Sequence, residues 1–370
     1  MIYRKQANTI AQVHEGVSEA INFFTDQNNR YEKDYWGRTG IRIKLPRGAK
    51  TPILWFRGHE RYDYKLRPNI QRKTSGILGP VQTYNQLLLR ENVRSALVSA
   101  RVTHLVDRDY LNSIDWQVLT EHYGSKTRLL DWSESLNVAL TFALEPHISN
   151  PQDKRFSQRI LEGVAPHIWV LNPVLLNMKV YEQIAADGDL VANALNDLDS
   201  ITPAYVAKIL EYLKKGINNY LLDSEYALSG IVSLYAIENM RINVGSRLKR
   251  LLERDEFNPF LYLAARIYID RLKCGNYVPP IAILHPYHST RIEKQRGTFS
   301  VFAMPPVDAS GKTEETLAFE DFKNLRDCLF KIELGDVRHL ASEMLHIGQT
   351  RAELYPELQT YAEELEWGAQ

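Results

Sequence analysis

The segment from His122 to Ser133 constrains this chain more than any other, because it mixes side chains that an apolar core does not tolerate. It reads His-Tyr-Gly-Ser-Lys-Thr-Arg-Leu-Leu-Asp-Trp-Ser and places Arg128 and Asp131 on either side of two leucines. A half-buried Arg or Asp needs a partner, since an unpaired buried charge is very costly. The segment therefore predicts either the floor of a ligand pocket or a structural ion pair, and both interpretations stay open.

The composition is that of a globular chain with a sizeable core. Its 370 residues exceed the usual size of one domain, and 44% of them are hydrophobic. No segment is apolar enough to span a bilayer, and residues 1–6 lead into a polar stretch without a signal-peptide core. Cys274 and Cys328 form no disulfide framework or ligand cluster. We therefore expect a cytoplasmic protein with no membrane partner.

The charge balance argues against one class of function. The chain has 45 basic and 45 acidic residues, so its formal net charge is zero. A protein whose main task is to coat nucleic acid needs a concentrated basic face. The composition still leaves room for a local basic groove, so nucleic acid stays open as a partner.

Periodicity predicts helices and short strands without a regular βαβ alternation, which is typical of an α+β protein. We expect a small split or mixed β-sheet core with flanking helices and a helical insertion. Strands are predicted at 52–58, 127–132, 167–171, 280–284, 298–302 and 328–332. Helices are predicted at 13–28, 80–107, 110–122, 134–144 (capped by Ser133), 291–294, most of 174–275, and 337–365 with a break near Tyr355.

Three separated pieces of the chain share one pattern. They comprise Phe56-Arg57-Gly58 with Leu66-Arg67-Pro68 and Arg72; Glu121 to Gly124, Thr127 to Trp132, Ala139 and Phe142-Ala143; and Arg291-Ile292, Gln295, Gly297, Phe299 and residues 354–358. Together they resemble the FRG domain family, named for a Phe-Arg-Gly signature, over about residues 50–145 and 280–360. Ser125-Lys126 departs from the Leu-Pro that is usual in the family and loosens the turn before Thr127. The resemblance implies a domain but no reaction.

The resemblance also suggests a domain organisation. Residues 1–45 would form an N-terminal helical extension and 46–173 the first part of the FRG domain. Residues 174–275 would form a helical insertion or subdomain that could offer a surface to a protein partner. Residues 276–370 would hold the second part of the FRG domain and the C-terminal helices.

Arg57 ends an apolar strand and directly precedes Gly58. Its planar guanidinium suits a phosphate or a carboxylate, and the glycine lets another backbone or a ligand approach closely. An internal ion pair with Asp131 or Glu121 would explain Arg57 equally well. The residue is therefore either a ligand contact or part of a structural network.

His122 and Tyr123 precede Gly124 at a predicted helix end. The His could act as a general base or hold a ribose hydroxyl, and the Tyr could stack on a planar base. A helix-terminal His beside a half-buried Tyr is the structural alternative. Strand alternation places Arg128 and Asp131 on different faces, which leaves Arg128 as a ligand candidate and favours a structural role for Asp131.

The arrangement is also loosely similar, at the level of the fold, to ADP-ribosyltransferase-like proteins, which bind NAD across a split sheet. The similarity rests on residues 55–58, on Trp132-Ser133 before a helix, and on residues 295–299 as a last motif. The carboxylate expected near that motif is absent unless Glu293 supplies it. A Gln cannot stabilise an oxocarbenium-like centre as a carboxylate does, which counts against transferase chemistry.

We therefore expect a nucleotide-binding (NAD-like) enzyme that cleaves or transfers at an N-glycosidic bond, such as an ADP-ribosyltransferase-like enzyme or an NAD glycohydrolase. A role as a toxin or anti-phage defence effector would suit this activity. NAD is the candidate substrate, and no His or Cys has the spacing of a metal site. Candidate catalytic residues are Arg57, His122, Tyr123, Arg128, Ser133 and Gln295. Candidate binding residues are Arg57, Gly58, His122, Tyr123, Gly124, Thr127 and Arg128.

Two alternatives belong to other classes. The first is a non-catalytic module that binds or senses a nucleotide or nucleic acid. The second is a signature that is wholly structural, in which Arg57, Arg128 and Asp131 form a buried network.

Overall fold

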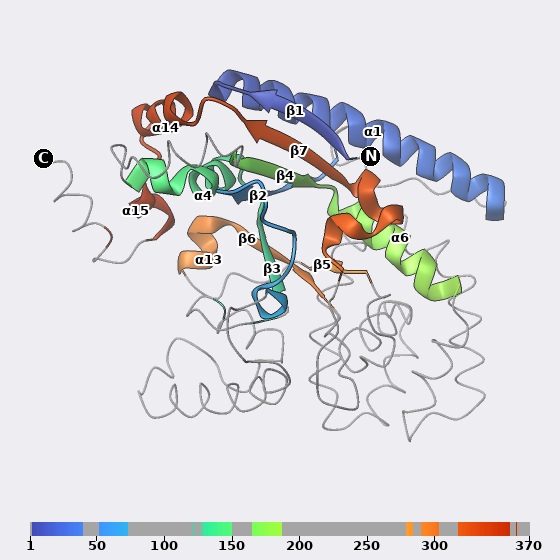
Figure 1. Ribbon diagram of the computed structural model, residues 1–370. Helices are drawn as coiled ribbons and strands as arrows, with labels where there is room; N and C mark the ends of the chain where they lie inside the picture. Colours follow the sequence, from blue (N-terminus) through green and yellow to red (C-terminus); the bar gives the residue numbers. More distant parts are fainter. Residues whose placement is uncertain are drawn as a thin grey trace, which may run out of the picture.

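The computed structural model describes residues 2–39, 52–72, 121, 127, 129–149, 165–186, 279–283, 290–302, 317–355 and 360. Within them, a curled, mixed sheet of seven strands has the order β1-β7-β4-β2-β3-β6-β5, with helices beside it (Figure 1). The predicted α+β class is confirmed. The predicted helix at 80–107, nearly all of that at 110–122 and residues 187–275 lie outside the described residues.

The strands follow the predicted pattern with one addition. They are β1 (Tyr3–Ala7), β2 (Trp55–His59), β3 (Leu129–Ser133), β4 (His167–Leu171), β5 (Ile281–Ile283), β6 (Gly297–Val301) and β7 (Leu329–Leu334). The six predicted strands are confirmed to within a few residues at either end. Strand β1 was not predicted because its sequence, Tyr-Arg-Lys-Gln-Ala, has mostly exposed side chains and no apolar alternation. It forms by pairing in parallel with β7, whereas all other strand pairs are antiparallel.

The described helices are α1 (Ile10–Thr39), α4 (Leu136–Ser149), α6 (Pro173–Ala186), α13 (Thr290–Gln295), α14 (Val337–His346) and α15 (Arg351–Leu354). Helices α1, α4 and α13 extend beyond their predicted limits, whereas the helix predicted from 337 is interrupted at 347–350, earlier than the predicted break near Tyr355. Helix α1 continues past residue 28, and α4 starts two residues after Glu134 and runs on through Pro146. A short 3-10 helix, Asn69–Gln71, follows Pro68. None of the described helices combines the length and apolar character needed to span a membrane.

One face of the sheet carries the hydrophobic core. Side chains alternate between the two faces of a strand, so every second residue of β2, β4 and β7 points to the same side. On this side α1, α4 and α14 cover the sheet (Figure 1). The strand residues of this core include Phe56, Ile168, Val170, Phe330 and Ile332.

The opposite face of the same strands is polar. The register pairs Arg57 with Trp169, and Trp169 with Lys331. In the next row of the sheet, His59 pairs with His167. We call this the polar face, formed by Arg57, His59, His167, Trp169 and Lys331.

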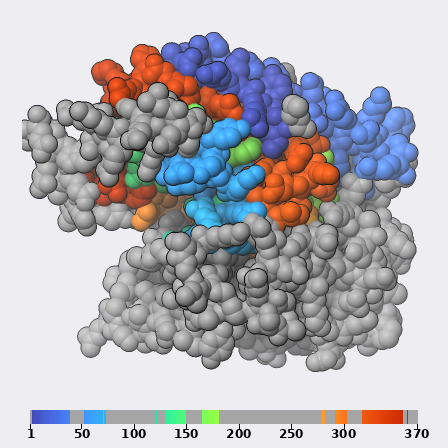
Figure 2. Space-filling model, viewed as in Figure 1, coloured from blue at the N-terminus to red at the C-terminus, as the bar shows by residue number. Residues whose placement is uncertain are grey.

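The light-blue residues 52–72, which include β2 and the segment after it, reach the surface in Figure 2, between the N-terminal segment and residues after 317.

The sheet is split between β2 and β3. Only Phe56 and Ser133 are paired across this junction, whereas β2 pairs with β4 along five residues. Beyond the single pair the two strands diverge, so the sheet opens on the side where Arg57 lies. This opening positions the candidate site.

Candidate functional site

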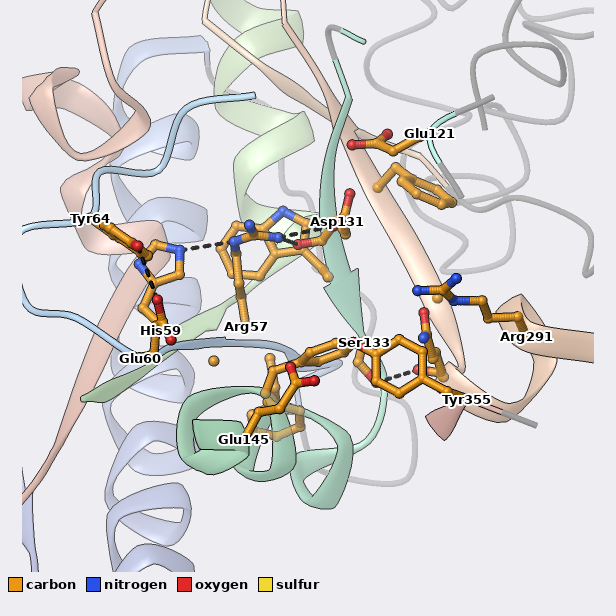
Figure 3. A pocket seen from close by; sticks show the side chains of 18 of the residues that line it. Arg57, His59, Glu60, Tyr64, Glu121, Asp131, Ser133, Glu145, Arg291 and Tyr355 are labelled. Atoms are coloured by element: carbon orange, nitrogen blue, oxygen red, sulfur yellow. Dashed lines mark hydrogen bonds and ion pairs between the residues drawn. The ribbon is translucent and has the colours of Figure 1, made fainter. Parts of the chain in front are cut away.

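A cleft with a volume of about 460 Å³ lies at the split between β2 and β3. Its walls come from β2, β3, β6, α4, α13 and the residue after α15, with Glu121 at one end (Figure 3). The volume is within the range of roughly 300–1,000 Å³ that is typical of small-molecule sites. Segments far apart in the sequence therefore meet around one hollow that can hold a ligand.

The structure places the predicted site residues in three groups. Arg57, Gly58, Ser133 and Gln295 line the cleft. Thr127 is buried behind it, where its hydroxyl donates to Glu121 Oε2 at 2.8 Å. The others lie outside the described residues: His122, Tyr123, Gly124 and Arg128.

Arg57 bridges the split in the sheet. Its Nη1 donates a hydrogen bond to the backbone oxygen of Asp131 at 2.6 Å and lies 3.4 Å from the Oδ2 atom of the same residue. Its Nε donates to Nε2 of His59 at 2.9 Å. The guanidinium thus connects β2 to β3 at a level where the two strands are not paired through their backbones. Of the two roles that the sequence left open for Arg57, the ion pair with Asp131 is present.

Gly58 is required by the packing of α4 on β2. A Cβ atom at this position would lie 1.9 Å from the backbone oxygen of Ala139 and 2.7 Å from the backbone nitrogen of Ala143. No side chain fits in that space. The close approach inferred from the sequence is therefore made by another backbone, although Gly58 also lines the cleft.

Two carboxyl groups meet beside Arg57. Burial raises the pKa of Glu121 well above its usual value, as do the negative charge of Asp131 and a hydrogen bond between the two carboxyl groups. The hydrogen bond from Thr127 acts in the opposite direction. Two close carboxyl groups cannot both ionise easily, which makes Glu121 a candidate for proton transfer. This candidate lies in the cleft beside a guanidinium.

Residues 52–152 match the FRG domain family. The chain contains an FRG domain. No curated protein matches the chain, and no solved structure matches it either. The comparisons thus give no support to the similarity with ADP-ribosyltransferase-like proteins. The FRG match spans β2, β3 and α4, so the FRG domain supplies Arg57, Asp131, Glu121 and both edges of the split.

Residues beyond the FRG match, among them Arg291 and Tyr355, line the other side of the cleft. Burial raises the pKa of Tyr355 to about 12, and the negative charge of Glu145 adds to this effect. The guanidinium carbons of Arg291 and Arg351 lie 4.6 and 5.3 Å from the centre of the Tyr355 ring. Arg351 also pairs with Glu145 on α4, with Nε 3.0 Å from Oε1. This wall therefore presents an aromatic ring that is held by two cations.

Ser133 and Gln295 connect the FRG domain to this wall. The Ser133 hydroxyl donates to the backbone oxygen of Gln295 at 2.7 Å and accepts from the backbone nitrogen of Ser135 at 2.9 Å. The Gln295 amide donates to the backbone oxygen of Leu354 at 3.3 Å. The predicted capping role of Ser133 is wrong: α4 begins at Leu136, and Ser133, the last residue of β3, bonds the backbone of Ser135, which precedes the helix. A contact of either side chain with a substrate stays a prediction.

Sequence reasoning missed several groups around the cleft. The sequence named Glu121 as a motif residue and as an ion-pair partner of Arg57, and it gave Glu145 and His59 no role. The resemblance pointed to Arg291 and Tyr355 as motif residues without a role. For Glu121 the signal was its place directly before His122, whereas nothing in the sequence pairs His59 or Glu145 with the site.

Proposed function

We propose that this protein binds a nucleotide such as NAD in the cleft and cleaves or transfers at its N-glycosidic bond. The observation that carries the proposal is the placement of Arg57 beside the Glu121–Asp131 carboxyl pair in a cleft of ligand size. Cleavage of the N-glycosidic bond of NAD develops positive charge on the ribose, which a carboxylate stabilises, while the cationic nicotinamide leaves as a neutral base with the electron pair of the broken bond. Water or another acceptor then bonds to the ribose and gives up a proton, which a second carboxylate can take. The pair supplies both carboxyl groups.

Each side of the cleft suits a different part of a nucleotide. Arg57 and Arg72 line the same wall, and their guanidinium groups suit phosphate. Loss of hydration and the positive charge of Arg57 lower the pKa of Arg72, which places the two charges near each other. On the opposite wall Tyr355 meets Phe142 edge to face, with ring centres 6.2 Å apart. These rings suit a planar base.

The carboxyl groups come from a different motif than the fold-level similarity suggested. Glu293 is exposed on α13 and does not line the cleft, so it does not replace the missing carboxylate of the last motif. In the proposal Asp131 faces the developing positive charge and Glu121 takes the proton of the attacking water or acceptor. The mechanism therefore depends on Glu121 and Asp131 rather than on Gln295.

The test is the release of a base from NAD and related nucleotides by the purified protein. Replacing Glu121 with Gln keeps the size of the side chain but removes a carboxylate that can take a proton, so the rate should fall roughly 100-fold or more. Glu293→Gln is the matched control, because this exposed Glu lies outside the cleft, and its rate should equal that of the wild type. No release by the wild type from any nucleotide tested would contradict the proposal.

A non-catalytic nucleotide- or nucleic-acid-sensing module is the second candidate, and one observation favours it. Arg57, Ser133 and Gln295 all have intramolecular hydrogen bonds, as in a preformed binding site. Such a module would be stabilised thermally by a nucleotide without turnover, equally in the wild type and in Glu121→Gln. A rate difference between these two proteins would exclude this candidate.

Two further parts of the proposal concern the cell. The first part is the cellular role: consumption of NAD would suit a toxin or an anti-phage defence effector. The second part is a protein partner, for which residues 174–275 would offer the surface. Growth arrest on expression of the wild type, but not of Glu121→Gln, would support the first part. Unchanged growth and NAD levels in both strains would count against it.

A further inference from the structure

We infer that His59 is a positioning residue, whose neutral imidazole fixes the Arg57 guanidinium across the split in the sheet. The inference rests on the proposed function for its consequence, because Arg57 is the group that would hold the nucleotide. His59 follows Arg57 by two residues on β2, so both side chains lie on the polar face. Figure 3 shows Arg57 between His59 and Asp131, joined to each by a dashed line.

The hydrogen bond determines the protonation state of His59. A guanidinium has five N–H donors and no acceptor. Because Arg57 Nε donates to His59 Nε2 at 2.9 Å, that ring nitrogen must carry a lone pair and the ring proton must be on Nδ1. Protonation of Nε2 would turn the contact into a repulsion between two cations.

The surroundings of His59 keep the ring neutral. Its side chain is only 3% exposed. Burial lowers the pKa of His59 well below its usual value, and the positive charges of Arg57, Arg72 and Lys331 lower it further, as does the neighbouring ring of His167. The ring centres of His59 and His167 are 5.1 Å apart, and the Tyr64 ring closes the other side at 6.0 Å. His59 therefore stays an acceptor throughout the neutral pH range.

Arg57 is thus held at two points. The bond to His59 fixes Nε on the β2 side, and the bond from Nη1 to the Asp131 backbone oxygen fixes the other end on β3. Together they set the plane of the guanidinium, and its remaining N–H groups are those that can reach a phosphate in the cleft. A guanidinium oriented before binding loses less rotamer freedom when the ligand arrives. His59 should therefore act on ligand affinity through Arg57.

Two variants at this position separate orientation from folding. His59→Gln offers an amide oxygen that can accept the Arg57 hydrogen bond, whereas His59→Leu has a similar size and no acceptor. The affinity for NAD, or for ADP-ribose as a stable probe, should fall about 10- to 100-fold in His59→Leu. It should recover in His59→Gln to within roughly threefold of the wild type. His14→Leu, at an exposed position on α1, is the matched control and should bind as the wild type does.

A second readout does not depend on the ligand. The NMR signal of the Arg57 Nε–H group should exchange slowly with water in the wild type and in His59→Gln, and quickly in His59→Leu. The pH profile is the third readout: as the pH falls through 6.5 the affinity should change equally in the wild type and in His59→Gln, because the carboxyl groups of Glu121 and Asp131 are present in both and the pKa of His59 is held well below its usual value.

The outcomes distinguish the two proposals. If the wild type neither binds nor cleaves any nucleotide, the proposed function fails, while the exchange of the Arg57 Nε–H group still tests the role of His59. If His59→Leu retains both the affinity and the slow exchange, the positioning role is refuted. If His59→Gln loses as much affinity as His59→Leu and its Arg57 signal exchanges as fast, the role is also refuted.

Discussion

The two faces of strands β2, β4 and β7 differ in almost every physical property. Toward α1, α4 and α14 the strands present Phe56, Ile168, Val170 and Phe330, which are all buried in the hydrophobic core. Toward the other side, the alternate residues of the same strands form the polar face. A strand gives its two faces independent sequences, because its side chains alternate. The sheet can therefore be a stable scaffold on one face and carry chemistry on the other.

The polar face is costly to bury. Within the described part of the chain, the Nδ1 atom of His59 and the Nε1 atom of Trp169 have no hydrogen-bond partner. Lys331 is 4% exposed, and its ammonium lies 3.7 Å from the centre of the Tyr62 ring. Buried polar groups without partners cost free energy that core residues do not. The comparison thus predicts opposite responses to mutation on the two faces.

Gly58→Ala should have the largest effect on stability, because the added methyl group would push α4 away from the core face of β2. The added Cβ would lie 1.9 Å from the Ala139 oxygen, so the helix must move away from β2. We expect a loss of more than about 4 kcal/mol in the free energy of unfolding, measured by urea denaturation. The control is Gly37→Ala on α1, where an added Cβ atom would meet nothing within 4 Å. This substitution should stabilise the helix by up to about 1 kcal/mol, because Ala favours helix more than Gly does. Equal stability of the two variants would contradict the packing argument.

Phe330→Ala tests the core face on β7, one residue from Lys331. Phe330 is fully buried and stacks on Tyr3 with ring centres 4.9 Å apart. Its truncation should cost roughly 3–5 kcal/mol through lost burial and the cavity that remains. The same denaturation measurement checks the value, and a loss below about 1 kcal/mol would show that this face is not the core.

His167→Leu tests the polar face through pH. Burial, and then the positive charge of Lys331, lower the pKa of His167 to about 3. Between its unfolded value near 6.5 and this value, the unfolded chain binds a proton that the folded protein does not. The stability of the wild type should therefore fall as the pH drops through this window, by roughly 4–5 kcal/mol from His167.

The variant lacks this titration, so its unfolding free energy should depend less steeply on pH between 6.5 and 3. Denaturation curves at a series of pH values measure the slope. His59 contributes in the same direction and remains in the variant, so part of the slope should persist. Identical slopes in the two proteins would refute the assignment to His167.

Lys331→Met should have the smallest effect, with the opposite sign to Phe330→Ala. Burial lowers the pKa of Lys331 to about 8, so the folded protein loses stability from this group as the pH falls from 10.5 through 8. Met removes the buried charge but also its contact with Tyr62, and we expect a net gain of about 1 kcal/mol at pH 7. Melting temperatures at pH 7 and 9.5 check this, since the gain should shrink at the higher pH. A lower melting temperature at pH 7 would show that the ring contact outweighs the burial cost.

Much of the fold could be predicted from local patterns. The strand at 167–171 is apolar and ends before Asn172-Pro173, and its predicted limits match β4. Strand β1 could not be predicted in this way, because its stability comes from pairing with β7, more than 300 residues away. The limits of α4 were wrong by a few residues, since packing on β2 extends the helix through Pro146.

The candidate site was predicted only in outline. The sequence named Arg57, Gly58, Ser133 and Gln295 among its candidate site residues, and all four line the cleft. Their individual contacts did not follow, because a hydrogen bond depends on atomic positions within a few tenths of an ångström. His59 illustrates this: its sequence position is next to the motif, but its role depends on the register of β2 with β4.

The amino-acid sequence by itself determined most of the secondary structure and many of the residues that could carry chemistry, because both depend on residue type and spacing along the chain. Only the tertiary structure decided that β2 and β3 diverge after one pair, that Arg57 bridges them and that Glu121 meets Asp131. These relations join segments more than 70 residues apart, or carboxyl groups whose charges matter only once they are close and buried. Proximity and loss of water arise on folding, so no local pattern can encode them.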